Sequence, residues 1–184
     1  MCSSDLRDQR TALARALERL NEIATRDELT GLPNRRAMGE LLLTETARHA
    51  RLKAPLSLAV IDIDRFKQIN DRLGHAAGDA VLRGFAHRLE SELRGADVLA
   101  RWGGEEFLLL LPGTDAEQAL QAVERLREGL RLQPFDDVEP GMRVSFSAGV
   151  GLCLGQGDID SALERADRAL YRAKAAGRDR SEPA

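Results

Sequence analysis

The chain of 184 residues is 43% hydrophobic but only 4% aromatic, so aliphatic side chains must fill the core of what we expect to be one globular domain. Its net charge of −3 gives no reason to expect a nucleic-acid polymer or a membrane surface as partner. No apolar run approaches the roughly 18 residues of a membrane span. Cys2 and Cys153 match no metal spacing, and the N-terminus has no signal pattern. We therefore expect a soluble protein in the reducing cytoplasm.

Residues 5–26 are expected to form one helix. Its apolar positions fall on steps of three and four, interrupted at Arg10, and give an a/d stripe of about three heptads. The stripe consists of Leu6, Leu13, Leu17, Leu20 and Ala24. Two interpretations are open, because such a helix could pack on its own domain or form a parallel coiled coil with a second copy. We treat residues 1–26 as distinct from the domain formed by residues 27–184.

The rest of the chain alternates between helical and strand patterns. The expected elements are a helix at 34–52, a strand at 56–63, a helix broken near Gly74 and His75 that resumes at 78–93, strands at 98–101 and 107–111, a helix at 115–130 with Asp115 as N-cap, a strand at 143–152 and a helix at 159–176 ended by Gly177. The order strand, helix, strand, strand, helix, strand is that of a ferredoxin-like α+β core, an antiparallel sheet with helices on one face.

Two carboxylates end the first of these strands. Asp62 and Asp64 continue the alternating face of Leu58 and Val60, so they extend a buried face. A buried carboxylate without a partner is unfavourable, because desolvation disfavours its charged form. A divalent cation is the strongest candidate partner, and an ion pair with an arginine is an equal alternative for Asp64.

The stretch Arg101-Trp102-Gly103-Gly104-Glu105-Glu106-Phe107 joins two expected strands and is therefore read as a hairpin turn. In a ferredoxin-like sheet its tip would approach Asp62. Carboxylate oxygens of Asp62 and Glu105 suit a hard cation such as Mg²⁺, which keeps waters and binds substrate phosphates. Gly103 and Gly104 lack a Cβ, so the backbone can turn with positive φ and a phosphate can come close.

Other polar residues fit a nucleotide. Lys67 could place positive charge beside phosphates, and Asn70 and Asp79 have the donors and acceptors to read a polar base edge. Lys174 and Arg178 are four residues apart and would share one helical face. A simpler explanation of this last pair is the preference of helix C-termini for cations.

Six blocks in order make the chain resemble the GGDEF domain family, the catalytic domain of diguanylate cyclases, over residues 27 to about 180. The blocks span residues 27–36, 62–71, 74–79, 101–107, 145–150 and 166–178. The resemblance implies condensation of two GTP molecules into cyclic di-GMP with release of two pyrophosphates, with Mg²⁺ as cofactor and Mn²⁺ as a possible substitute. Glu105 stands where the family usually has Asp, and both residues offer a carboxylate.

The resemblance also assigns roles to individual residues. It implies metal ligation by Asp62, the Ile63 carbonyl and Glu105, with Glu106 beside them. Glu105 and Lys67 take the catalytic positions, although water could replace Glu105 as the base. The implied substrate-binding residues are Phe66, Asn70, His75, Asp79, Gly103, Gly104, Lys174 and Arg178. Of these, Asn70 and Asp79 would read guanine, while Lys174 and Arg178 would hold the triphosphate.

Regulation is implied by Arg94 and Asp97, which match the family's Arg-x-x-Asp site for inhibition by the product. An ordinary capped turn is the alternative explanation. Because each domain holds one GTP, the product requires a homodimer, which favours residues 1–26 as a dimerisation helix coupled to an upstream sensory domain through residues 27–30. A catalytically silent module that binds GTP or cyclic di-GMP is an alternative function, and a related nucleotidyl cyclase or polymerase palm is a third.

Overall fold

The computed structural model describes residue 10, residue 13 and residues 21–155 and 157–184. Most of the helix expected at residues 5–26 therefore lies outside the described residues, and residues 21–25 at its end are helical. The coiled coil expected there stays a prediction. None of the described helices is long and apolar enough to cross a membrane.

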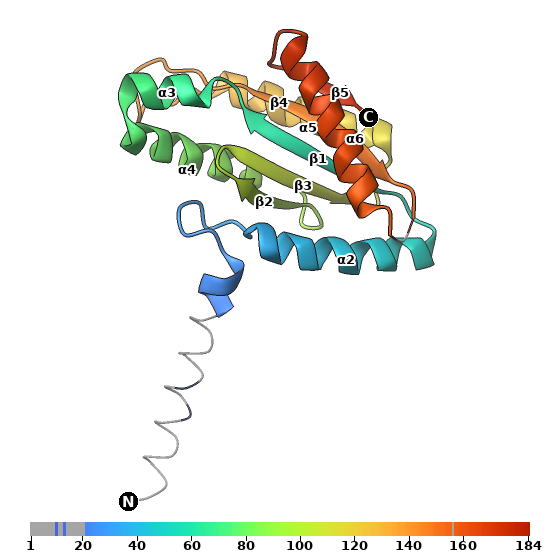
Figure 1. Cartoon of the computed structure of the whole chain (residues 1–184). Helices are drawn as coiled ribbons and strands as arrows, with labels where there is room; N and C mark the ends of the chain where they lie inside the picture. The colour runs from blue at the N-terminus through green and yellow to red at the C-terminus, as the bar shows by residue number, and fades with distance from the viewer. Residues whose placement is uncertain (1–9, 11–12, 14–20, 156) are drawn as a thin grey trace, which may run out of the picture.

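One five-stranded sheet runs through the molecule in the order β2-β3-β1-β4-β5 (Figure 1). Its strands are β1 (Leu56–Ile63), β2 (Val98–Gly103), β3 (Glu106–Pro112), β4 (Phe146–Cys153) and β5 (Ser181–Pro183). The central strand β1 is antiparallel to both β3 and β4, whereas β5 is parallel to β4. The first four strands have the ferredoxin-like order, which confirms the predicted α+β fold. The sequence analysis missed β5, so the sheet is mixed rather than wholly antiparallel.

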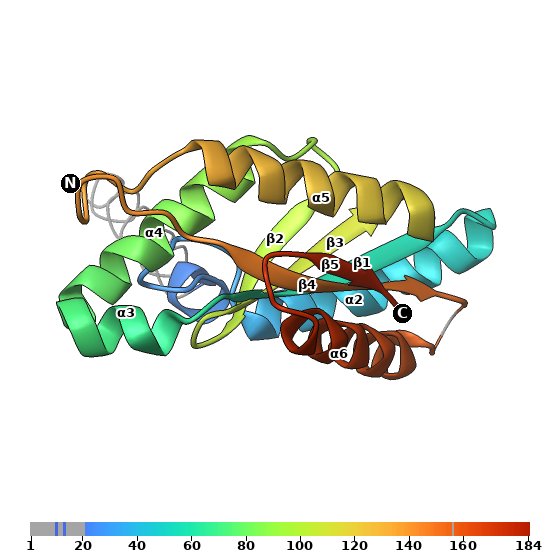
Figure 2. The ribbon, with the colours of Figure 1, turned by 90° about the horizontal axis from the view of Figure 1, so that it is seen from above.

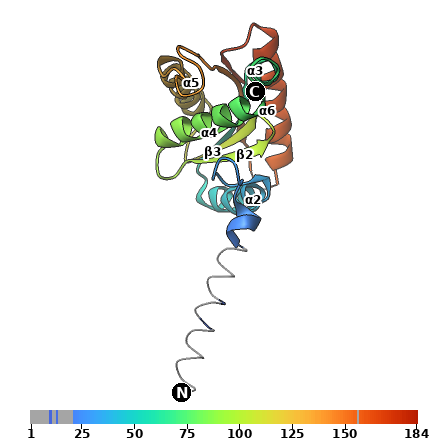
Figure 3. The same cartoon turned by 90° about the vertical axis from the view of Figure 1, so that its left-hand side faces the viewer.

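Helices cover both faces of this sheet (Figures 2 and 3). On one face lie α3 (Phe66–Leu73), α4 (His75–Ser91) and α5 (Ala116–Leu132), the helices of the ferredoxin-like core. On the other face lie α2 (Arg35–Leu52) and α6 (Ile159–Ala175). The predicted arrangement, with all helices on one face of the sheet, is therefore right for the ferredoxin-like core. It is wrong once α2 and α6 are included. It failed because an amphipathic pattern gives a helix an apolar side without saying which face of the sheet that side covers.

The alternation of β1 explains the two cores. Ala59 and Ile61 pack toward α4 and α5, while Leu58 and Val60 pack toward α2 and α6, and every residue of β1 is buried. The phenylalanines gather on the first side, where the Phe85 ring lies 4.9 Å from that of Phe107 and 5.7 Å from that of Phe146. Both faces thus fix the position of the strand that ends in Asp62.

Candidate active site

The hairpin between β2 and β3 meets the end of β1, as the sequence predicts. Asp62 lies opposite Glu106 in the antiparallel register, and the Ile63 N–H donates to the carbonyl of Glu105 at 3.3 Å. Gly103 and Gly104 are exposed at the tip, and Gly104 has a φ of 24°. The acidic end of one buried strand and the acidic tip of a hairpin are therefore neighbours.

Asp62 carries an unfavourable charge in this arrangement. It is 7% exposed, and burial raises the pKa of its carboxyl above the ordinary value. The Lys174 ammonium of α6, 2.9 Å from the Asp62 Oδ2, opposes this rise, and the charges of Glu105 and Glu106 add to it. A further cation at this point would stabilise all three carboxylates.

The donor set fits a hard cation that takes only part of its ligands from the protein. Within the residues that the structure describes, no group of three or more His, Cys, Asp or Glu side chains is arranged to hold a metal. The Asp62 carboxylate nevertheless already attracts the Lys174 ammonium, and two further carboxylates act on it electrostatically. Such oxygen donors suit a cation that completes its shell with backbone carbonyl, water and phosphate oxygens.

Asp64 has a different role from the one expected. Its Oδ1 accepts from the Ser147 hydroxyl at 2.7 Å, and its Oδ2 accepts from the Ser145 hydroxyl at 2.8 Å and the Asp179 N–H at 3.0 Å. No arginine pairs with it among the described residues, so the alternative of an ion pair with an arginine is wrong. Three hydrogen-bond donors satisfy this buried carboxylate.

The α3–α4 hairpin brings predicted nucleotide contacts together around Gly78. A Cβ built on Gly78 would lie 1.9 Å from the Asn70 Oδ1 and 3.2 Å from the Phe66 Cζ, so both side chains lie against this glycine. Asp79 follows on the next position of α4 and is exposed. Lys67 and His75 are exposed as well, and α4 begins at His75 rather than at the predicted Gly78. The sequence analysis missed Gly78 as the residue that leaves space for Asn70.

Lys174 and Arg178 do not share a helical face. Helix α6 ends at Ala175, Gly177 turns with a φ of 115°, and Arg178 follows with a φ of 66°. The Arg178 N–H donates to the Ala173 carbonyl at 3.0 Å, so Arg178 lies in the turn beyond the helix. The prediction failed because α6 ends at Ala175, before it reaches Arg178.

Arg101 ties the chain segment before α2 to the hairpin. Its Nη1 donates to both Asp27 oxygens at 3.1 Å, and its Nε and Nη2 donate to the Gly104 carbonyl at 3.0 and 2.9 Å. Burial raises the pKa of the Asp27 carboxyl, but hydrogen bonds from Thr30 and Arg101 outweigh burial and leave it lowered. The segment expected to relay signals therefore contacts the candidate site through one half-buried guanidinium.

Arg94 and Asp97 form a capped turn that also borders a pocket. The Arg94 N–H donates to the Asp97 Oδ2 at 3.2 Å, and the Asp97 N–H donates to the Arg94 carbonyl at 3.0 Å. The turn borders a cavity of about 340 Å³, which is also lined by Gln121 and Arg125 of α5. Both interpretations of the motif are therefore compatible with the geometry. Arg125 was missed, because only the fold brings α5 beside this turn.

Known proteins match the part of the chain that contains all of these candidate site residues. The family model described as "Diguanylate cyclase, GGDEF domain" matches residues 24–180. The chain is 49% identical to diguanylate cyclase DgcP of Pseudomonas aeruginosa over 91% of its length, and 45% identical to the response regulator PleD of Caulobacter vibrioides over 86%. It covers 25% and 36% of those two proteins, so it spans about a third of their length or less.

Solved structures agree with the family match. The chain superposes with a TM-score of 0.91 and 30% identity on the coiled coil and GGDEF domain of DgcB from Caulobacter crescentus in complex with c-di-GMP, over 98% of this chain and 96% of that one. It superposes with a TM-score of 0.75 and 39% identity on the active GGEEF domain of a diguanylate cyclase from Vibrio cholerae, over 82% of this chain and 96% of that one. The latter carries the Gly-Gly-Glu-Glu-Phe motif found here at residues 103–107.

Proposed function

Because this chain belongs to the diguanylate cyclase GGDEF domain family, we propose that it condenses two GTP molecules into cyclic di-GMP and releases two pyrophosphates. The observation that carries the proposal is the meeting of Asp62 with the hairpin tip at Glu105 and Glu106. The buried Asp62 carboxylate lies 2.9 Å from the Lys174 ammonium, and the negative charges of Glu105 and Glu106 act on it as well. Such a point suits a metal-bound triphosphate.

The family is generally metal-dependent, and the oxygen donors at this point favour Mg²⁺, with Mn²⁺ as a substitute. Asp62, the Ile63 carbonyl and Glu105 would hold the ion, with Glu106 beside them. Bound Mg²⁺ would favour the deprotonated form of the attacking 3′-hydroxyl and stabilise charge on the departing pyrophosphate. Because Asp62 is buried, little bulk water reaches it, and its attraction for a bound cation is correspondingly stronger.

The basic residues around the carboxylates would hold the phosphates. Lys174, whose ammonium lies 2.9 Å from the Asp62 Oδ2, would be available to contact the triphosphate once the Asp62 charge is balanced by a bound cation. Lys67 and Arg178 are exposed and can add positive charge where negative charge develops in the transition state. The exposed glycines Gly103 and Gly104 leave room beside them. Glu105 or a water molecule takes the proton of the 3′-hydroxyl.

Guanine selection is assigned to the α3–α4 hairpin. Asn70 and Asp79 supply an amide and a carboxylate, which together can bond both the acceptor and the donor edge of guanine. The Phe66 ring and Asn70 lie against the same glycine, so the polar and apolar parts of this surface are adjacent. His75 stands at the start of α4 as a further substrate contact.

Product formation requires two such domains facing each other, each with one GTP, so we propose a homodimer as the active form. Residues 1–26 would join the two copies and receive the output of an upstream sensory domain in a larger cytoplasmic protein. Cyclic di-GMP would inhibit by binding at Arg94 and Asp97, and Arg125 adds a third charged group to that pocket. An arginine fork suits phosphate and guanine edges.

The test is product formation from GTP and Mg²⁺ by the purified chain, with cyclic di-GMP identified by chromatography and mass. Glu105→Gln keeps the shape but removes the charge, and should lower the rate roughly 10²–10⁴-fold. Glu40→Gln, exposed on α2, is the matched control and should leave the rate unchanged. Nucleotide binding without pyrophosphate release by the unchanged chain would instead favour a silent binding module.

A further inference from the structure

The turn after α6 has an unusual backbone. Gly177, Arg178 and Asp179 follow one another with φ values of 115°, 66° and 47°. The left-handed region is unfavourable for residues with a Cβ, and two such residues in a row persist only where their surroundings hold them there. The turn that carries Arg178 must therefore be fixed by contacts outside itself.

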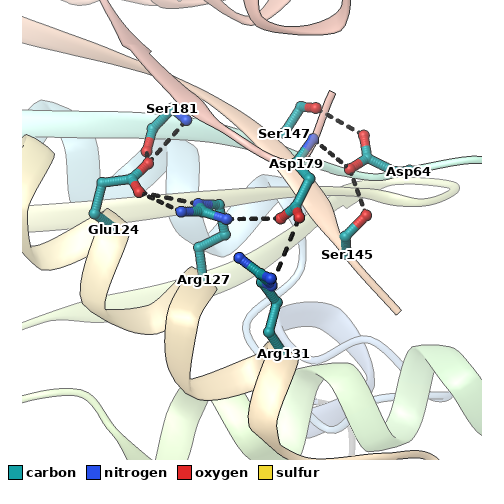
Figure 4. Close-up of polar contacts among 8 residues, drawn as sticks. All are labelled: Asp64, Glu124, Arg127, Arg131, Ser145, Ser147, Asp179 and Ser181. Atoms are coloured by element: carbon teal, nitrogen blue, oxygen red, sulfur yellow. Dashed lines mark hydrogen bonds and ion pairs between the residues drawn. The ribbon is translucent and has the colours of Figure 1, made fainter. Parts of the chain in front are cut away.

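The first contact is made by the backbone. The Asp179 N–H donates to the Asp64 Oδ2 at 3.0 Å (Figure 4). Asp64 is itself 7% exposed and is held by the Ser145 and Ser147 hydroxyls at 2.8 and 2.7 Å. Because Asp64 is separated from Asp62 by one residue, this bond connects the turn to the end of β1 at which we propose that the metal binds.

The second contact is made by the Asp179 side chain. Its Oδ1 accepts from the Arg127 Nη1 at 2.8 Å, and the Arg131 Nε lies 3.8 Å from its Oδ2. Arg127 is 11% exposed on α5 and also donates to the Glu124 Oε2 at 3.0 and 2.7 Å (Figure 4). Glu124 and Asp179 together raise the pKa of this guanidinium, although burial opposes them. Glu124 in turn accepts from the Ser181 N–H at 3.0 Å.

These contacts hold a turn that borders open space. A cavity of about 550 Å³ lies beside it, lined by Asp64 and all three turn residues. Arg178 is exposed, and its guanidinium has no ion-pair partner among the residues that the structure describes. Its backbone is thus fixed on both sides while its side chain remains available to a ligand.

We propose that Arg127 and Asp179 are positioning residues that aim Arg178 at the terminal phosphates of bound GTP. The inference rests on the proposed function, in which Arg178 contacts the triphosphate. Neither Arg127 nor Asp179 touches the substrate; they fix the backbone of Arg178 before the substrate arrives. Less conformational freedom is then lost on binding, and the phosphate contact is correspondingly stronger.

The experiment compares two ligands by calorimetry in Mg²⁺ buffer. One is 3′-deoxy-GTP, which lacks the attacking hydroxyl and cannot be condensed, and the other is GMP, which lacks the terminal phosphates. Arg127→Met should lower the affinity for 3′-deoxy-GTP roughly fivefold to tenfold and leave the affinity for GMP unchanged. Arg127→Lys should recover part of the loss, because it keeps one charged contact to Asp179. Equal losses for both ligands would overturn the proposal.

A double-mutant cycle separates positioning from general structure. In an Arg178→Ala background, Arg127→Met should cause no further loss of 3′-deoxy-GTP affinity, because the group that it positions is gone. An equal loss in both backgrounds would overturn the proposal. Asp179→Asn, which leaves the backbone bond to Asp64 in place, serves as a second variant should Arg127→Met fail to fold, and the same cycle decides with it.

The matched control is Arg165→Met. Arg165 makes an ion pair of the same length, 2.8 Å to the Asp158 Oδ2, and donates to the Leu152 carbonyl, but near the start of α6. Its loss should leave the ratio of the two affinities unchanged, and a changed ratio would contradict the proposal. If the unchanged chain binds 3′-deoxy-GTP but makes no cyclic di-GMP from GTP, the proposed function is refuted while the cycle still decides this inference. Absence of binding would refute both.

Discussion

Gly78 shows how a single missing Cβ shapes the candidate guanine site. Alanine at this position would place a carbon 1.9 Å from the Asn70 Oδ1, so the amide must leave its place against α4. We expect Gly78→Ala to raise the KM for GTP about tenfold or more, because a displaced bidentate contact costs the site about 1–3 kcal/mol. Steady-state kinetics with GTP and ATP measure this, and the preference for GTP should fall as well.

Gly39→Ala is the control for this substitution. Gly39 is also helical, and a Cβ there meets nothing within 4 Å. The change should leave the KM for GTP unchanged and stabilise α2 by roughly 0.5–1 kcal/mol, because alanine loses less backbone entropy than glycine. An unchanged KM in Gly78→Ala would mean that Asn70 does not read the base.

Single residues differ in how far the sequence predicts them. The neighbourhood of Asp62 and Glu105 followed from alternation along one strand and the order of strands in a ferredoxin-like sheet. The hydrogen-bond partners of Asp64 did not, because its three donors come from positions 81, 83 and 115 residues away. A carboxylate at the end of a buried strand indicates that a partner is needed, but the sequence does not show whether that partner is a metal, an arginine or a hydroxyl.

At the scale of elements, α6 reaches the site because β4 lets it come close. A Cβ on Gly149 would lie 1.9 Å from the Ala166 carbonyl oxygen and 2.4 Å from the Leu170 nitrogen, and both are backbone atoms that cannot rotate away. Gly149→Ala should therefore push α6 off the sheet and destabilise the fold by about 1–3 kcal/mol. Urea unfolding measures the loss, and Lys174 should be displaced from Asp62.

The comparison variant is Gly129→Ala on α5, where a Cβ meets nothing within 4 Å. It should be neutral or slightly stabilising. Equal stability of the Gly149 and Gly129 variants would show that α6 does not depend on this close approach.

The link between Asp27 and Arg101 joins the segment before α2 to β2 and should show in the pH dependence of stability. The lowered pKa of Asp27 means that the folded state favours its charged form. Its stabilisation is therefore fully present above the unfolded pKa of about 4 and is lost as pH falls through the lower folded value. Asp27→Asn should cost about 1–3 kcal/mol at neutral pH, and the gap to the unchanged chain should close in acid.

Urea unfolding at stepped pH values measures this gap. Asp71→Asn on the exposed side of α3 is the control and should cost less free energy of unfolding at neutral pH than Asp27→Asn does. A gap for Asp27→Asn that stays constant into acid would contradict the assigned charge interaction.

Helices and strands were predicted correctly where the sequence pattern was long and depended only on neighbouring residues. The bounds of β1 and the N-cap at Asp115 followed from an apolar run and a capping residue. Two features could not be predicted in this way. Strand β5 has three residues and includes Pro183, so it carries no pattern of its own and exists because β4 pairs with it. The covering of both faces depends on long-range packing rather than on the helix sequences.

At the scale of the whole molecule, the candidate site is half of what the reaction needs. The groups that we assign to one GTP lie within one domain, whereas the product contains two guanosine monophosphate units. In the proposed reaction the facing surface comes from a second copy, and the residues that would join the copies lie largely outside the described range. Activity should therefore depend on association and not only on the geometry of Asp62 and the hairpin.

The most direct test is the initial rate of cyclic di-GMP formation per mole of protein, measured over a wide range of protein concentration at saturating GTP and Mg²⁺. The account predicts that this specific activity rises with concentration and then levels off, as dimers come to dominate. A specific activity that is constant across the range, or a chain that binds GTP yet makes no cyclic product at any concentration, would contradict it.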